Sequence, residues 1–426
     1  MSGKAWDEDW CQELSNIRVR YNKLLIPDPV LVDQNIISFG FNYTSLKETN
    51  FDEILDRLSN LVYTVTTNTV VPVAGVELWK RKLEQLNAHL QLLKKVKQCL
   101  YNSDRGSLFY IQDEMNEVMY APNKDFFDLT LAELKKRFSQ KDKLNRLKPF
   151  DFFDYINLLP PYEELLRKHP YVSFPERPLD DNFLITMEEL KKLFEKELKK
   201  LSLDNNWKVL IDKTHKYDHV QVFYRTKTIL IPSARNILDP QIPNTITHKK
   251  YLRLVAHEIQ THVQRSASGF GSKLKLLSVG LDSYLLAEEG LATFREQQAV
   301  GTTHQYYAGF ESYLAISLAL GIDRDNKKRS PVELFEILTS IYKDLYSKNF
   351  LQAQHSALKK IKRIYICRPG QTSYLINTRD LCYRMGNMQM HDIFSRESIQ
   401  DNQLNIGMYD PGNKRHVDAL RALSLL

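Results

Sequence analysis

The stretch AHEIQTHVQR, residues 256–265, constrains the fold more than any other part of the sequence. It places His257 and His262 five positions apart in a segment whose apolar spacing predicts a helix. In a regular α-helix, five positions rotate a side chain by roughly 140°, so the two imidazoles would diverge. They point the same way only where the helix contains a π-type turn, in which positions i and i+5 stack. The spacing therefore indicates either two unrelated histidines or a locally widened helix.

Glu258 follows His257 directly, and this combination indicates a hydrolytic metal site. A zinc hydrolase needs three protein ligands, an open position and a carboxylate that takes a proton from water. His257 and His262 would supply two ligands, and Glu258 would supply the base. The hydroxyl of Thr261 can bond a carbonyl behind it and help to bend the turn.

The third ligand should be a carboxylate on a following helix, and LAEEGLATF offers Glu288 and Glu289. Both lie in a mainly apolar stretch, where a buried carboxylate is costly unless a cation neutralises it. Gly290 comes next and would let another backbone approach closely. A surface acidic pair on an ordinary helix is the alternative.

Apolar spacing elsewhere predicts a mostly helical chain. Helices are expected over residues 6–21, 51–65, 76–101, 185–203, 245–265, 282–300, 305–320 and 331–363. Thr186 and Glu189 have the spacing of a capping box. The β-branched runs 207–213 and 220–232 predict two or three antiparallel strands, with a polar break from Arg225 to Lys227.

Strands, a motif helix and a second acidic helix follow one another in the order that a zincin metallopeptidase needs. We therefore expect an α+β fold: a mostly helical, zincin-like metallopeptidase with a small antiparallel sheet beside the motif helix. Residues 1–150 are expected to form a helical region that packs on the catalytic part. Residues 151–184, rich in proline and aromatic residues, form a connector, and residues 185–426 form the catalytic domain.

Composition argues against several other classes of protein. Cys11, Cys99, Cys367 and Cys382 show no CxxC pair, which disfavours a disulfide framework or a cysteine-based zinc site. The sequence has no run of 18 apolar residues and no apolar segment near its start, so we expect a soluble, cytoplasmic protein without membrane contact. The net charge of +7 is spread along the chain. The lysine-rich stretch 134–148 is interpreted as a solvated helix face, without a nucleic-acid partner.

HEIQTHVQR followed by GLDSYLLAEEGLATF is similar to the HEIGTH…R and (Q/E)EGLA motifs of a family first known only as a domain of unknown function. Its bacterial members are named for flavohaemoglobin expression and the QEGLA motif. Its animal members include the microtubule-associated tyrosine carboxypeptidases. The resemblance extends from the N-terminal helices to the RDLCYRMG region. This chain differs at Gln260, where the family commonly has glycine.

The resemblance implies that His257, His262 and Glu289 bind Zn²⁺ and that Glu258 is the catalytic carboxylate. Glu288 occupies a position that is glutamine in many bacterial members and is expected to act behind the ligands. Tyr383 resembles a recurrent tyrosine of the family and is a candidate to stabilise the oxyanion, with a buried core tyrosine as the alternative.

A carboxypeptidase must also hold the terminal carboxylate of its substrate, which suits a bidentate arginine. Arg265 lies three residues after His262, and Arg368 resembles an arginine in a strand-to-turn element of the family. For each, a structural salt bridge is the alternative, for Arg265 with Glu288 as an example.

The animal members imply removal of a C-terminal tyrosine from α-tubulin, with a microtubule-associated location in a eukaryote. Strand 220–232 would form the edge above the cleft, and Arg225 and Lys227 would suit an acidic peptide such as a tubulin tail. A bacterial peptidase with another substrate, and a catalytically silent protein of the same fold, stay as alternatives.

Overall fold

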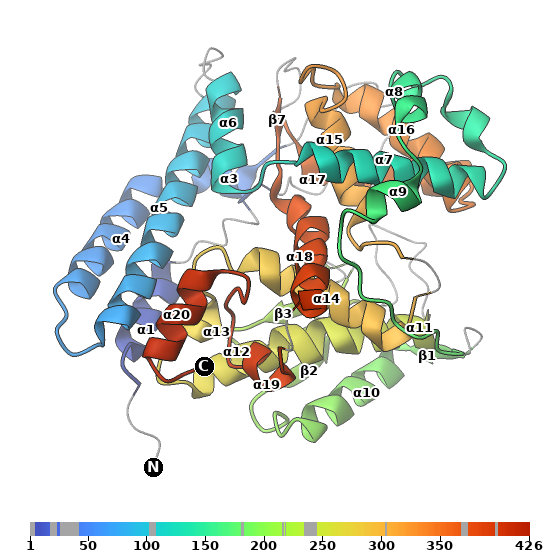
Figure 1. Cartoon of the computed structure of the whole chain (residues 1–426). Helices are drawn as coiled ribbons and strands as arrows, with labels where there is room; N and C mark the ends of the chain where they lie inside the picture. Colours follow the sequence, from blue (N-terminus) through green and yellow to red (C-terminus); the bar gives the residue numbers. More distant parts are fainter. Residues whose placement is uncertain are drawn as a thin grey trace.

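The computed structural model describes residues 5–17, 24–25, 42–101, 108–179, 183–214, 217, 219–233, 245–302, 305–367, 374–396 and 399–426. These residues are mostly helical, with small sheets (Figure 1). The first part of the chain contains α1 (Glu8–Ile17), α3 (Thr44–Glu48), α4 (Phe51–Thr66), α5 (Val73–Tyr101), α6 (Leu108–Val118), α7 (Lys124–Ser139) and the 3₁₀-helix η1 (Leu144–Leu147). The proline-rich connector adds the short helices α8 (Phe153–Leu158) and α9 (Tyr162–Leu166).

The second part begins with α10 (Met187–Lys200), where Thr186 and Glu189 form the expected capping box. The motif segment is one continuous helical stretch made of α11 (His248–Leu254), η2 (Val255–Val263) and α12 (Gln264–Gly271). The remaining helices are α13 (Leu276–Val279), α14 (Leu285–Val300), α15 (Phe310–Leu320), α16 (Pro331–Leu345), α17 (Phe350–Ile364), η3 (Arg379–Leu381), α18 (Cys382–Arg396), α19 (Asp401–Leu404) and α20 (Lys414–Ala422).

The sheet beside the motif helix has three strands in the order β2 (Lys208–Ile211), β4 (Thr228–Ile231) and β3 (Gln221–Phe223). β3 and β4 form an antiparallel hairpin that turns at the predicted polar break, where Lys227 has a φ of 47°. β2 pairs with β4 in parallel, so the expectation of a purely antiparallel sheet is wrong. The reason is the order of the strands in the sheet. The second strand of the hairpin, β4, lies beside β2, whereas a purely antiparallel sheet would have β3 there.

Two further pairs of strands were not predicted from the sequence, because these strands are only two or three residues long. β1 (Leu184–Thr186) pairs with β5 (Thr245–Thr247), and β6 (Tyr365–Ile366) pairs with β7 (Leu375–Ile376), both antiparallel. Each of β1 and β5 leads directly into a helix, α10 and α11 respectively. The β1–β5 ladder therefore fixes the start of the motif segment.

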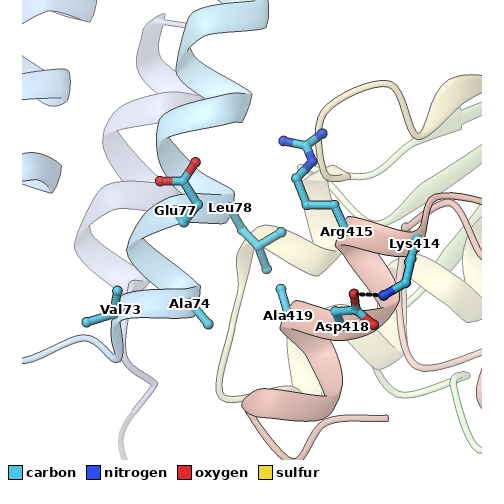
Figure 2. A pocket seen from close by; sticks show the side chains of 8 residues that line it. All are labelled: Val73, Ala74, Glu77, Leu78, Lys414, Arg415, Asp418 and Ala419. Atoms are coloured by element: carbon cyan, nitrogen blue, oxygen red, sulfur yellow. Dashed lines mark hydrogen bonds and ion pairs between the residues drawn. The ribbon is translucent and has the colours of Figure 1, made fainter.

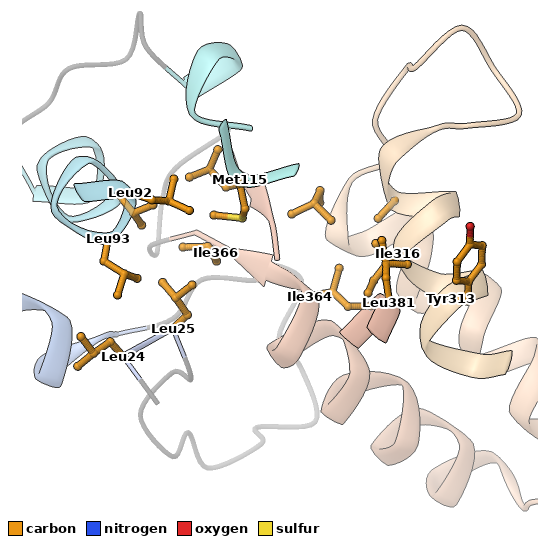
Figure 3. Close-up of a cluster of buried hydrophobic side chains, with 14 of the residues drawn as sticks. Leu24, Leu25, Leu92, Leu93, Met115, Tyr313, Ile316, Ile364, Ile366 and Leu381 are labelled. Carbon is orange, nitrogen blue, oxygen red and sulfur yellow. The ribbon is translucent and has the colours of Figure 1, made fainter. Parts of the chain in front are cut away.

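The largest hydrophobic cluster joins the two ends of the chain. It runs from Trp10 in α1 to Leu423 after α20, and Figure 3 shows Leu92 and Leu93 of α5 facing Ile364 and Ile366 across it. The N-terminal helices therefore share their core with the C-terminal third of the chain. A separate cluster fills the space between α10, the three-stranded sheet and η2, with Phe194, Ile229 and Ile259 fully buried.

Helices α14 and α18 cross at two glycines (Figure 1). A Cβ atom on Gly290 would lie 2.3 Å from the backbone of Gly386, and one on Gly386 would lie 2.0 Å from the carbonyl oxygen of Leu286. Both distances are far inside van der Waals contact, so a side chain at either position would force the two helix backbones to move apart. The predicted close approach of another backbone at Gly290 is confirmed.

Gly386→Ala should lower the free energy of unfolding by about 1–3 kcal/mol, because the added methyl group meets backbone that cannot move aside as a side chain could. Thermal or urea unfolding measures the change. Gly271→Ala is the matched control, since a Cβ there meets nothing within 4 Å. Equal stability of the two variants would contradict the close crossing of α14 and α18.

Candidate metal centre

The motif helix contains the widened turn that the histidine spacing requires. Residues Val255–Val263 form a π-helix between two α-helical segments. The hydroxyl of Thr261 donates a hydrogen bond of 2.8 Å to the carbonyl oxygen of Ala256, five residues earlier, as predicted. Arg295 of α14 donates to the carbonyl oxygen of Gln260. The side chain of Gln260 is exposed, so this residue enters the turn without displacing the core.

The π-turn brings the two imidazoles onto one side of the helix. Their ring centroids are 4.8 Å apart. His257 Nε2 lies 3.7 Å from Glu289 Oε2, and His262 Nε2 lies 3.8 Å from the same oxygen. Ligand atoms around a tetrahedral zinc ion lie roughly 3.3 Å apart, given bond lengths near 2.0–2.1 Å. The three residues predicted as ligands thus converge with nearly the spacing that zinc needs.

Glu289 provides the test of whether a cation fits. Its side chain is 10% exposed, and its Oε2 atom is buried without a hydrogen-bond partner among the described residues. A buried carboxylate oxygen without a partner is costly, whereas a cation would satisfy it. Two imidazole nitrogens and one carboxylate oxygen form a typical zinc donor set. The residues present therefore fit this metal.

Carboxylates behind the histidines orient both rings. His257 Nδ1 lies 2.7 Å from Glu296 Oε1, and His262 Nδ1 lies 2.8 Å from Glu288 Oε1. Ionised carboxylates only accept hydrogen bonds, so each Nδ1 carries a proton, and Nε2 is the ring nitrogen that faces Glu289 and is left for a metal ion. Glu288 thus lies behind His262, the place expected for it if His262 binds a metal, and Glu296 makes the same contact with His257.

The electrostatic field of the site favours positive charge. Burial opposes protonation of His257, but its hydrogen bond to Glu296 and the neighbouring carboxylates, Glu258 among them, raise its pKa to about 9. Burial likewise opposes protonation of His262, while the bond to Glu288 and the charge of Glu289 raise its pKa. The same carboxylates would attract a metal cation.

Glu258 lies at the edge of this group and is half-buried. One of its carboxylate oxygens and one ring nitrogen from each histidine lie within 4.8 Å of one another. Glu289 is the better third ligand because its unpartnered oxygen is shared by both Nε2 atoms. With Glu289 as the third ligand, Glu258 would lie beside a bound ion, where a base can reach a water molecule.

Arg265 does not reach a substrate. It is fully buried, donates to Glu288, and donates 2.9 and 2.7 Å hydrogen bonds to the carbonyl oxygens of Leu404 and Tyr409. The salt bridge with Glu288, named above as the alternative, is present. Arg265 therefore positions Glu288, and its expected role in substrate binding is corrected. Arg368 lies outside the described residues.

Tyr383 belongs to the first turn of α18 and is half-buried next to the candidate ligands. The negative charge of Glu289, followed by burial, raises the pKa of Tyr383 well above its usual value, so its hydroxyl keeps its proton. Tyr224, directly after β3, is a second half-buried tyrosine at the site. Burial, then the charges of Glu288 and other site residues, raise the pKa of Tyr224.

Sequence reasoning missed several residues of this site. Glu296 lies seven positions after Glu289, which is two helical turns on the same face of α14, so periodicity could have found it. Tyr224 lies beside the polar break at Arg225, but only the tertiary fold brings it to the carboxylates. Arg379, in the 3₁₀-turn before α18, also interacts electrostatically with Tyr383 and Glu289. Nothing local in the sequence marks it.

Two surface grooves lie apart from the ligands. One of about 880 Å³ separates α5 from α20, and Figure 2 shows Glu77 and Leu78 facing Arg415 and Ala419 across it. Another of about 540 Å³ runs along η2 at Gln260 and Arg295. No helix in the described part of the chain is both long and apolar enough to cross a membrane.

Glu289→Gln should weaken zinc binding by more than about 100-fold, because it removes a ligand charge and leaves a buried amide beside two imidazoles. Wild-type protein should hold about one zinc ion per chain. Elemental analysis after dialysis, and competition with a fluorescent chelator, measure stoichiometry and affinity. Wild-type affinity in this variant would remove Glu289 from the ligand set.

Glu296→Gln should weaken zinc binding by about 10–100-fold, since His257 loses the charge that holds its proton on Nδ1. The same chelator competition measures it. Glu84→Gln, an exposed substitution on α5, serves as the control and should leave affinity unchanged. If both variants bind zinc equally well, Glu296 does not orient the ligand.

Comparison with known protein families and with curated proteins found no match to this chain.

Proposed function

We propose that this chain is a zinc-dependent metallocarboxypeptidase with a zincin-like catalytic region. The observation that carries the proposal is the convergence of His257 Nε2 and His262 Nε2 on the unpartnered, buried Oε2 of Glu289, with Glu258 alongside. The motif resemblance supports the same assignment. His257, His262 and Glu289 would hold the ion.

Zinc bound there would supply Lewis-acid chemistry, polarising the scissile carbonyl and lowering the pKa of a water molecule. Glu258 takes a proton from the water molecule whose oxygen attacks the scissile carbonyl carbon, and it passes this proton to the amine nitrogen as the C–N bond breaks. Glu288 and Glu296 keep both imidazoles in the tautomer that donates its Nε2 lone pair.

Tyr383 donates a hydrogen bond from its hydroxyl group to the oxyanion that develops on the scissile carbonyl. Its raised pKa supports this role because a donor must stay protonated at neutral pH. Tyr224, which directly follows β3 of the hairpin, is near enough to the same carboxylates for their charges to raise its pKa.

An extended substrate can add to the edge of the three-stranded sheet. β3 pairs with β4 on one side only among the described strands, and it contacts η2. A peptide beside β3 would pass the metal site as an added strand. Arg225 is exposed near this edge and suits an acidic chain end such as a tubulin tail.

The resemblance supports removal of a C-terminal tyrosine as the specific reaction, in the cytoplasm and on microtubules in a eukaryote. A peptidase with another substrate in a bacterium, or a catalytically silent zinc protein, are the competing assignments. Substrate profiling distinguishes a tyrosine carboxypeptidase from a peptidase with another substrate. The comparison of wild type with Glu258→Gln distinguishes an enzyme from a catalytically silent protein.

Glu258→Gln should lower kcat by at least about 10³-fold on peptides that end in tyrosine or phenylalanine, because the amide cannot accept a proton from water. Mass spectrometry follows the freed amino acid. Zinc content and melting temperature should stay at wild-type values, since Glu258 is not assigned as a ligand.

Equal turnover by wild type and Glu258→Gln would remove this carboxylate from the mechanism. Absence of amino-acid release by zinc-loaded wild type, across peptides ending in all common residues, would contradict a carboxypeptidase. Tyrosine released faster than other residues would support the tubulin-like substrate over an unrelated one.

A further inference from the structure

A group of basic side chains lies at the beginning of α18, next to the candidate metal centre. Lys360 and Arg363 of α17 and Arg379 of η3 all interact electrostatically with one carboxylate, Asp380, whose side chain is 12% exposed. Arg363 takes both oxygens of Asp380 through hydrogen bonds of 2.9 and 3.0 Å. Asp380 is therefore already matched by Arg363.

Arg379 is bound to Asp380 much more weakly than Arg363 is. Its contact with Asp380 is a single 3.4 Å hydrogen bond from Nη1. Its Nε is buried without an acceptor among the described residues, and its side chain is 20% exposed. A guanidinium has five N–H donors, and leaving a buried one unpaired is costly. Arg379 is therefore short of an acceptor while it still touches solvent.

The position of Arg379 ties it to the chemistry. It lies four residues before Tyr383, about one helical turn, and it interacts electrostatically with both Tyr383 and Glu289. A zinc ion would engage the charge of Glu289, which leaves Arg379 without a full negative partner. An anionic substrate group next to the metal would supply one.

We propose that Arg379 binds the C-terminal carboxylate of the peptide substrate and so selects free chain ends. This inference rests on the proposed peptidase function. A planar guanidinium pairs with a carboxylate through two parallel hydrogen bonds, which fixes the position of the scissile bond one residue away. Arg379 takes the place that the sequence analysis gave to Arg265, whose donors are committed inside the core.

The test uses two peptides that differ only in a C-terminal carboxylate or carboxamide. Zinc-loaded wild type should hydrolyse the carboxylate peptide at least about 100-fold better, measured as kcat/KM, and Arg379→Gln should remove most of that preference. Arg379→Lys keeps the positive charge but loses the paired N–H donors of the guanidinium group, so it should retain an intermediate preference for the carboxylate peptide. Arg363→Gln is the matched control, because it also removes an arginine from Asp380, and its preference should stay near that of wild type.

Binding provides a readout that does not need turnover. In a Glu258→Gln background with zinc bound, a fluorescently labelled carboxylate peptide should bind at least about 30-fold more tightly than its amide, and adding Arg379→Gln should equalise the two. Melting temperature and zinc content of each variant report on folding and on the metal centre.

The assignment would be overturned if Arg379→Gln kept its full preference for the carboxylate peptide, or if it weakened hydrolysis of both peptides equally. A loss of preference in Arg363→Gln as large as in Arg379→Gln would also overturn it, since the effect would then belong to Asp380. Failure of the proposed function is distinct, because wild type would then hydrolyse neither peptide while the binding comparison would still report on Arg379.

Discussion

The π-turn at Val255–Val263 is the constraint on which the rest of the site depends. Without it, His257 and His262 would leave the helix in different directions, and Glu289 would have no pair of imidazoles to face. Two side chains satisfy the irregular backbone: Thr261 bonds a carbonyl one wide turn back, and Arg295 bonds the carbonyl of Gln260 from the neighbouring helix. The distortion is thus held by contacts specific to this segment.

Helix α14 supplies most of the charged side chains that surround the π-turn. Glu288, Glu289 and Glu296 face the two histidines from this single helix, and Arg295 supports the turn itself. Such buried charges are tolerable only when each has a partner. Arg265 neutralises Glu288 through a buried salt bridge, whereas the unpartnered oxygen of Glu289 is left for a cation. Helix α18 crosses α14 at the two glycines, and its first turn brings Tyr383, with Arg379 just before it, near Glu289.

Local sequence patterns predicted the features that short-range interactions determine, namely helices, a helix cap and turns. Periodicity found the helices, the capping box at Thr186 and the hairpin turn, and the five-residue spacing of the histidines demanded the π-turn that the structure contains. Long-range pairing was harder: the parallel partner of β2 depends on how the hairpin inserts. Arg265 was misjudged because closeness in sequence to His262 says nothing about which way a guanidinium points. Arg379 comes near enough to interact electrostatically with Glu289 only through the packing of α18 on α14.

Zinc K-edge X-ray absorption of the protein loaded with one equivalent of zinc tests the central claim most directly. We expect nitrogen and oxygen ligands only, at about 2.0–2.1 Å, with outer-shell scattering from two imidazole rings. A sulfur ligand at about 2.3 Å would contradict the account, because it would recruit the buried Cys382, which lies near Glu289, in place of the predicted set. A spectrum without the scattering of two imidazoles would contradict it equally, since the π-turn would then have no role in binding the ion.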